Sequence, residues 1–101
     1  MSPPTEGTLT NTRRIQIQWD TVLTTNTGGS DIVSYNLYWD QGYDSWRSVV
    51  GETSNYLGTS YIIGIGITSG ASYKFKVRAE NKWGWGPFSD PIPIVASGPP
   101  S

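Results

Sequence analysis

The chain lacks the side chains that most often carry chemistry, because its 101 residues include no cysteine and no histidine. Without cysteine there is no disulfide, no thiolate nucleophile and no zinc–sulfur site. Without histidine the commonest general base and a frequent metal ligand are missing as well. These absences predict a domain that is not an enzyme and that holds no cofactor and no metal.

The chain also lacks an excess of charge of either sign and any long apolar run. Seven basic and eight acidic residues give a net charge of −1. Such a balance gives no electrostatic reason to expect a nucleic acid or an anionic membrane as partner. No apolar run approaches the roughly 20 residues that a membrane span needs, so direct membrane insertion is not expected. The length fits one domain, which we expect to be a monomer in isolation.

The clearest pattern that is present is strict alternation over residues 73–80. Apolar side chains occupy every second position, and charged side chains fill the gaps. This alternation is typical of a strand with one buried and one solvent-facing side. The apolar positions are Tyr73, Phe75, Val77 and Ala79, and the positions between them are Lys74, Lys76, Arg78 and Glu80.

Six further short strands are predicted, and no segment has convincing helical periodicity. The first lies around Leu9, and the others span residues 15–19, 32–39, 46–50, 61–67 and 88–95. Gly64 and Gly66 interrupt one of them, which indicates a bulge or a close backbone approach. Pro91 and Pro93 lack amide donors, so the last strand is expected at a sheet edge.

Several of these segments resemble fibronectin type III domains. Residues 73–89 read Tyr-x-Phe-x-Val-x-Ala-x-Asn-x-x-Gly-x-Gly-Pro-x-Ser, similar to the last two strands of that family. Trp19 ends an Ile-x-Ile-x-Trp strand, as the family's core tryptophan does. Ile67 lies six residues before Tyr73, which is similar to the family's tyrosine corner, although Ser69 and Ala71 replace its usual proline and threonine. In that corner the tyrosine hydroxyl bonds to the upstream backbone.

The resemblance implies an all-β fold, a seven-stranded antiparallel immunoglobulin-like sandwich. It covers residues 5–97, and the proline-rich stretches 1–4 and 98–101 are expected to be linkers to neighbouring domains. The expected core comprises Ile15, Ile17, Trp19, Tyr35, Leu37, Trp39, Ile67, Tyr73, Phe75, Val77 and Ala79.

Two surfaces are candidates for binding. The first is an aromatic patch at one pole, formed by Trp83, Trp85, Tyr56 and Leu57, since tryptophan and tyrosine dominate interface hot spots. The alternative for this patch is that Trp83 folds back over Pro87 or the base of the loop, which would leave only Trp85 exposed. The competing surface is the basic row of Lys74, Lys76 and Arg78 beside Tyr38, which an acidic partner would use or which is simply a solvent-facing side.

The remaining carboxylates do not change this picture. Asp40 and Asp44 bracket a turn, but two carboxylates supply too few oxygens for calcium, which needs about 6–8. A filled sandwich core also leaves no cleft for the paired carboxylates of a glycosidase.

The leading interpretation is a non-catalytic protein-binding or adhesion module of a multidomain, tandem-repeat protein. Its partner would be another protein or a neighbouring domain of the same chain. A purely structural spacer is the first alternative. A carbohydrate-binding appendage of a secreted polysaccharide-degrading enzyme is the second. The residues leave the compartment open, and only the resemblance favours an extracellular or cell-surface location.

Overall fold

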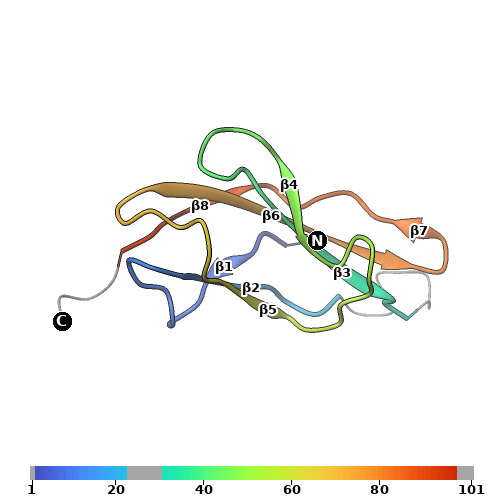
Figure 1. The fold of residues 1–101 in the computed structure, drawn as a ribbon. Helices are drawn as coiled ribbons and strands as arrows, with labels where there is room; N and C mark the ends of the chain where they lie inside the picture. The colour runs from blue at the N-terminus through green and yellow to red at the C-terminus, as the bar shows by residue number, and fades with distance from the viewer. Residues whose placement is uncertain (1, 23–30, 98–101) are drawn as a thin grey trace.

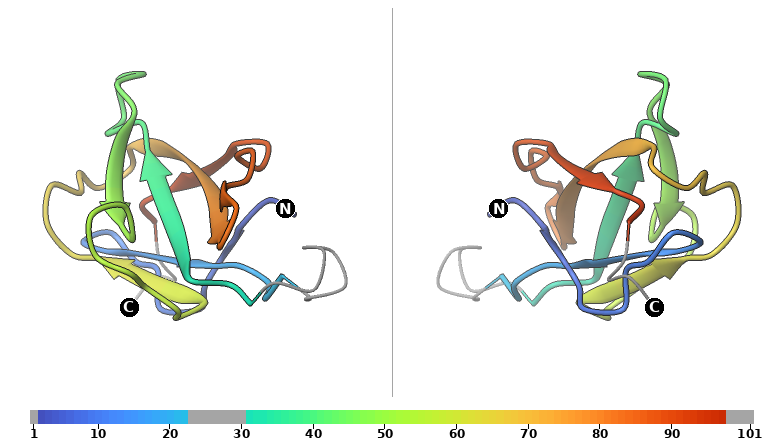
Figure 2. Two further views of the ribbon diagram at one scale, coloured as in Figure 1. Left: turned by 90° about the vertical axis from the view of Figure 1, so that its right-hand side faces the viewer. Right: turned by 90° about the vertical axis from the view of Figure 1, so that its left-hand side faces the viewer.

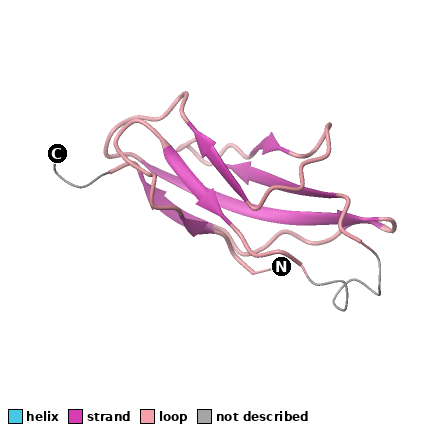
Figure 3. Cartoon of the chain, turned by 90° about the horizontal axis from the view of Figure 1, so that it is seen from below, coloured by secondary structure: helices cyan, strands magenta, loops and turns pink. Residues whose placement is uncertain are grey.

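The computed structural model describes residues 2–22 and 31–97, and all of its regular elements are strands (Figures 1 and 3). In chain order they are β1 Thr5–Glu6, β2 Ile15–Gln18, β3 Ser34–Trp39, β4 Arg47–Val50, β5 Ser60–Ile63, β6 Ser72–Asn81, β7 Gly84–Trp85 and β8 Ile92–Val95. The described residues contain no helix that could cross a membrane. The expected all-β class is confirmed.

The strands form two antiparallel sheets packed face to face (Figure 2). One sheet has the order β1-β2-β5. The other has the order β4-β3-β6, with β7 and β8 both paired to β6. These last two pieces lie along one strand line, β7 opposite Glu80 and Asn81 and β8 opposite residues 72–75. The expected seven-stranded sandwich is therefore present, with its last strand divided in two.

Ser89 bridges the gap between β7 and β8. Its amide donates to the carbonyl oxygen of Val77 at 2.8 Å, and its hydroxyl accepts from the Val77 amide at 3.1 Å. Gly86 donates to Ala79 in the same gap. Because backbone groups in the interior need partners, these bonds hold the interrupted strand on β6.

The core lies between the sheets and is built by alternate positions of β2, β3 and β6. Buried side chains include Ile15, Ile17, Trp19, Tyr35, Leu37, Tyr73, Phe75 and Val77. Three residues of the expected core, Trp39, Ile67 and Ala79, are only partly buried and pack against it from the side. The alternation seen in the sequence therefore places one face of β6 inside and the other outside.

The hydroxyl of Tyr73 is anchored to the backbone upstream. It accepts a hydrogen bond from the Thr68 amide at 2.7 Å and lies 3.4 Å from the Gly66 carbonyl oxygen. This is the contact that the spacing from Ile67 to Tyr73 implies, and it forms although Ser69 and Ala71 depart from the family's usual residues.

Gly51 shows why one position requires glycine. Its φ is 93°, and a Cβ there would collide with the carbonyl oxygen of Tyr35. The chain needs a left-handed residue and a close backbone approach at the same point, which only glycine permits.

Three strand predictions were wrong in position. The first strand is Thr5–Glu6, whereas Leu9 lies in an exposed turn. The strand expected over 61–67 ends at Ile63, and Gly64 has open space around it rather than a close neighbour. The strand expected from Phe88 begins only at Ile92, because Pro87 and Pro91 have no amide to donate and interrupt the regular pairing with β6. Pro4, assigned to the N-terminal linker, is fully buried.

Candidate functional site

The outer face of β6 carries a row of alternating cations and rings. Phe75 and Val77 point into the core, so Lys76 and Arg78 point outward. Rings from other segments flank them on this face. We call this set the aromatic–cation row; it consists of Trp46, Lys76, Phe88, Tyr38, Arg78 and Trp85.

The cations of this row lie directly over the rings. Lys76 Nζ is 4.3 Å from the ring centroid of Trp46 and 4.5 Å from that of Phe88. The guanidinium carbon of Arg78 is 4.3 Å from the Trp85 centroid and 4.6 Å from the Phe88 centroid. Such contacts each contribute about 0.5–1 kcal/mol at exposed sites and more when desolvated. The row therefore ties β6 to the segments on both of its sides.

Polar contacts fix the position of Arg78 within the row. Its Nε donates to Asn36 Oδ1 at 2.8 Å, and the buried Asn36 donates in turn to the Val50 carbonyl oxygen at 2.9 Å. Glu52 Oε1 lies 3.8 Å from Arg78 Nη2 and accepts a hydrogen bond from the Tyr38 hydroxyl at 3.0 Å. Partial burial raises the pKa of Tyr38, and the hydrogen bond to Glu52 raises it further.

Lys74, the remaining cation of the expected basic surface, lies outside this row. Its Nζ is 3.5 Å from Asp44 Oδ1, in an exposed ion pair. Each cation of the basic row thus has a partner within the domain, and Lys76 and Arg78 are partly covered by rings. An acidic ligand would have to compete with these contacts.

The aromatic patch expected at the pole is not assembled as a single surface. Tyr56 lies partly inside, where its hydroxyl donates to the Ser60 carbonyl oxygen at 2.6 Å and its ring lies 6.4 Å from that of Trp19. Its carbonyl oxygen also accepts from the Tyr35 amide at 2.7 Å. Tyr56 is therefore part of the packed structure, whereas the neighbouring Leu57 is 62% exposed.

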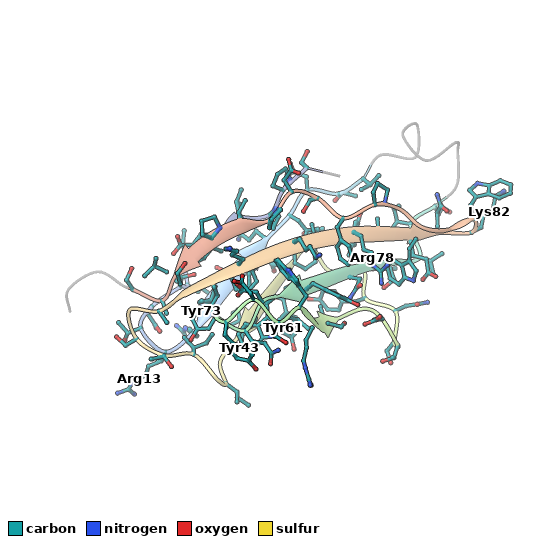
Figure 4. The ribbon with its side chains drawn as sticks, turned by 90° about the horizontal axis from the view of Figure 1, so that it is seen from above. Arg13, Tyr43, Tyr61, Tyr73, Arg78 and Lys82 are labelled. Atoms are coloured by element: carbon teal, nitrogen blue, oxygen red, sulfur yellow. The ribbon has the colours of Figure 1, made fainter. Side chains whose placement is uncertain are left out.

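Of the two loop tryptophans, Trp83 is the exposed one, whereas Trp85 is less exposed than expected. Trp83 is 75% exposed at the tip of the β6–β7 hairpin, where Lys82 Nζ lies 4.8 Å from its ring centroid. Trp85 belongs to β7 and is partly buried against Arg78. Figure 4 shows Lys82 at the tip of this hairpin, with Tyr43 and Tyr73 toward the other end of the molecule.

Trp46, Phe88 and Glu52 contribute to the outer face, although the sequence analysis did not select them. Trp46 precedes β4, and Phe88 lies between β7 and β8, so their sequence positions do not place them beside β6. The pairing of β6 with β3, β7 and β8 brings these segments together. Alternation on β6 indicated an outward basic row, but its partners depend on pairing between distant segments.

The order of the strands and the corner at Tyr73 define the class of protein, an immunoglobulin-like β-sandwich module. The family model of the fibronectin type III domain matches residues 2–95, and the chain belongs to this family. The family explains both the tyrosine corner and the core position of Trp19. Domains of this family are in general structural or binding modules rather than enzymes.

Solved structures agree with this assignment. The chain is 25% identical to the sixth fibronectin type III domain of human fibronectin type III domain containing protein 3, with a TM-score of 0.77 over 99% of this chain and 86% of that one. Titin module A71 from human cardiac muscle is 26% identical, with a TM-score of 0.66 over 95% and 91%. Domains A168–A170 of titin align with a TM-score of 0.71 at 24% identity, and there the match covers 95% of this chain but 32% of the longer one. Such domains occur in multidomain proteins.

Proposed function

We propose that this chain is a non-catalytic protein-binding module of a multidomain protein and that it contacts its partner through the tip of the β6–β7 hairpin. The observation that carries the proposal is the exposure of Trp83, at 75%, on a short hairpin beyond the packed sheets. Tryptophan is enriched among the residues that dominate binding energy, and an exposed ring at a hairpin tip is free to enter a pocket on a partner.

The neighbourhood of Trp83 supports a contact with protein. Lys82 beside the ring adds a positive charge, which would favour an acidic or polar rim on the partner. Leu57 is exposed in the loop that joins β4 to β5. The Tyr56 carbonyl oxygen in this loop accepts a hydrogen bond from the Tyr35 amide, near the end of β3 that lies beside the β6–β7 hairpin. The contact surface proposed here therefore consists of Trp83 with Lys82, and of Leu57 if the partner spans both loops.

The aromatic–cation row supports different roles for Trp85, at the base of the hairpin, and Trp83, at its tip. Trp85 packs on Arg78 and keeps β7 on the sheet, so it fixes the base of the hairpin that carries Trp83. A rigid base lowers the conformational entropy lost on binding. Trp85 is thus proposed to position the contact residue, in place of the direct contact role expected from the sequence.

The proposal is tested by placing a photo-crosslinking amino acid at position 83 in one variant and at position 43 in another. Tyr43 is the matched control because it is an aromatic residue of similar exposure, 68%, in the turn between β3 and β4. In the native extract we expect a specific crosslinked protein from position 83 and none from position 43. Equal crosslinking from both positions would contradict a localised contact surface.

The partner identified in this way is then purified, and its affinity is measured for the parent domain and for Trp83→Ala. We expect the substitution to weaken binding by about 30-fold or more, which corresponds to about 2 kcal/mol. Unchanged affinity would rule out the hairpin tip as the contact. A glycan array separates the carbohydrate alternative, because sugar binding that is lost in Trp83→Ala would assign the ring to stacking on a saccharide. A domain with neither kind of ligand would be a spacer.

A further inference from the structure

The edges of the two sheets are not equally protected against pairing with another strand. Natural sheets guard exposed edges with prolines, charged side chains or very short strands. Here β1 is two residues long and contains Glu6, β4 begins with Arg47, and β8 contains Pro93. β5, Ser60–Ile63, carries none of these guards.

The sequence around β5 is uncharged over an unusual length. No charged residue occurs between Glu52 and Lys74, although charged residues are spread through the rest of the chain. β5 itself reads Ser-Tyr-Ile-Ile and is followed by Gly64 and Ile65. β-branched and aromatic residues without charge favour pairing between strands.

The free side of β5 presents the backbone groups of Ile62, whereas the Ser60 carbonyl oxygen on the same side already accepts from the Tyr56 hydroxyl at 2.6 Å. Trp19 donates to the Thr59 carbonyl oxygen at 2.9 Å, and Gln16 accepts from Gly7 on the β1 side at 2.7 Å. Because hydrogen bonding alternates along an antiparallel pair, Tyr61 and Ile63 bond to β2. The amide and carbonyl of Ile62 therefore point to the other side, where no strand of the described chain lies; β5 borders the molecule in Figure 1.

Apolar surface surrounds this free edge. Ile62 is 42% exposed and Ile65 is 88% exposed. An open groove of about 320 Å³ lies alongside, lined by Trp39, Val49, Tyr61, Ile62, Ile63, Gly64 and Ile65. The groove has no charged residue in its lining, and a Cβ added at Gly64 would meet no atom within 4 Å. An approaching strand would therefore meet no charge in this groove and no steric block at Gly64, and it would displace the Tyr56 hydroxyl only if it paired as far as Ser60.

We propose that β5 is a homodimerisation edge, on which the β5 strand of a second copy of this chain adds in antiparallel orientation. A two-fold axis beside Ile62 lets the Ile62 residues of the two copies exchange their N–H···O=C hydrogen bonds and joins the two three-stranded sheets into one of six.

A second copy fits this edge better than an unrelated charged segment, because the edge is complementary to itself. Neither copy brings a charge into the uncharged groove, and the net charge of −1 gives little repulsion between chains. The two-fold arrangement is closed, because both copies use the same β5 edge and no open β5 edge remains for a third copy. The sequence alone predicts a monomer, so the dimer is a departure from that expectation.

Sedimentation equilibrium of the purified chain tests the dimer directly. We expect the mean mass to rise from one chain toward two as concentration increases, and to rise no further. Ile62→Lys places a charge on the edge and should lower the association constant by about tenfold or more. A wild-type mass of one chain at every concentration would overturn the proposal, as would a dimer that Ile62→Lys leaves unchanged.

A cysteine variant identifies the edge even if Ile62→Lys fails to fold. The chain has no cysteine, so Ile62→Cys introduces a single thiol. Opposed residues in a bonded antiparallel pair lie about 5.5 Å apart, within the range that a disulfide spans. Val95→Cys is the matched control, since Val95 lies on another edge strand, β8, and is 45% exposed. Mild oxidation should give a covalent dimer of Ile62→Cys and not of Val95→Cys. The reverse outcome, or equal crosslinking, would place any association elsewhere.

Discussion

Trp83 and Trp85 are the same side chain two positions apart, and the fold treats them in opposite ways. Trp85 is paired opposite Glu80 in β7 and lies on the guanidinium of Arg78. Trp83 lies in the two-residue turn before β7 and remains in solvent. Their flanking glycines, Gly84 and Gly86, do not distinguish them.

The difference shows that a neighbouring strand, and not the composition of the loop, decides which ring is covered. Arg78 faces outward because Val77 faces inward, and Trp85 meets it because β7 continues the pairing along β6. Trp83 has no strand opposite it and therefore no surface to pack on. Loop aromatics can thus serve either the fold or a partner, and pairing assigns the role.

Trp19 is a third tryptophan for the comparison, and it is enclosed by the core. It is buried between the sheets, with its ring 6.2 Å from Tyr35 and 6.4 Å from Tyr56. We expect Trp19→Ala to lower the free energy of unfolding by about 3–5 kcal/mol, because a large cavity replaces the ring. Chemical denaturation measures the loss. A native-like cooperative transition at the parent's midpoint would contradict the core position.

Trp85→Ala should have the next largest effect. It removes the ring over Arg78 and part of the cover of β7, and we expect a loss of about 1–2 kcal/mol in the free energy of unfolding. Trp85→Phe keeps a ring at this position and should restore about half of the loss. A Trp85→Ala domain as stable as the parent would mean that the contact with Arg78 contributes nothing and that the two tryptophans are equivalent.

The pH dependence of the free energy of unfolding tests the contribution of Tyr38 to the aromatic–cation row, which also contains Trp85. The pKa of Tyr38 is raised in the folded state, so the folded protein binds this proton more tightly than the unfolded chain does. The resulting contribution to stability is fully present below the ordinary tyrosine pKa of about 10 and is lost as pH rises through the higher folded value. Tyr38→Phe should show a shallower loss of stability than the parent above about pH 10. Parallel curves would exclude the effect.

Trp83→Ala should have the smallest effect on folding. Its ring makes few contacts within the domain, so we expect the free energy of unfolding to change by less than about 0.5 kcal/mol. Thermal and chemical unfolding measure this beside Trp85→Ala under identical conditions. A loss as large as that of Trp85→Ala would show that Trp83 supports the fold, and it would remove the basis for the proposed contact surface.

The sequence by itself determined the class of fold and most of its interior. Alternation over residues 73–80 indicates a strand whose apolar side is buried, and Trp19 and Tyr73 lie in the family's core and corner positions. These features are local or depend on spacing along one segment, because successive side chains of a strand point to opposite faces. The outward direction of Lys76 and Arg78 follows from the same rule.

Only the tertiary structure decided what those outward side chains meet. Trp46, Phe88 and Glu52 reach the outer face through the pairing of distant strands, and the same pairing covers Trp85 and leaves Trp83 exposed. The free edge at β5 likewise depends on strand order, since one strand's sequence does not state what lies beside it. The periodicity of a strand fixes which way a side chain points, whereas the partner it finds is a property of the whole arrangement of sheets.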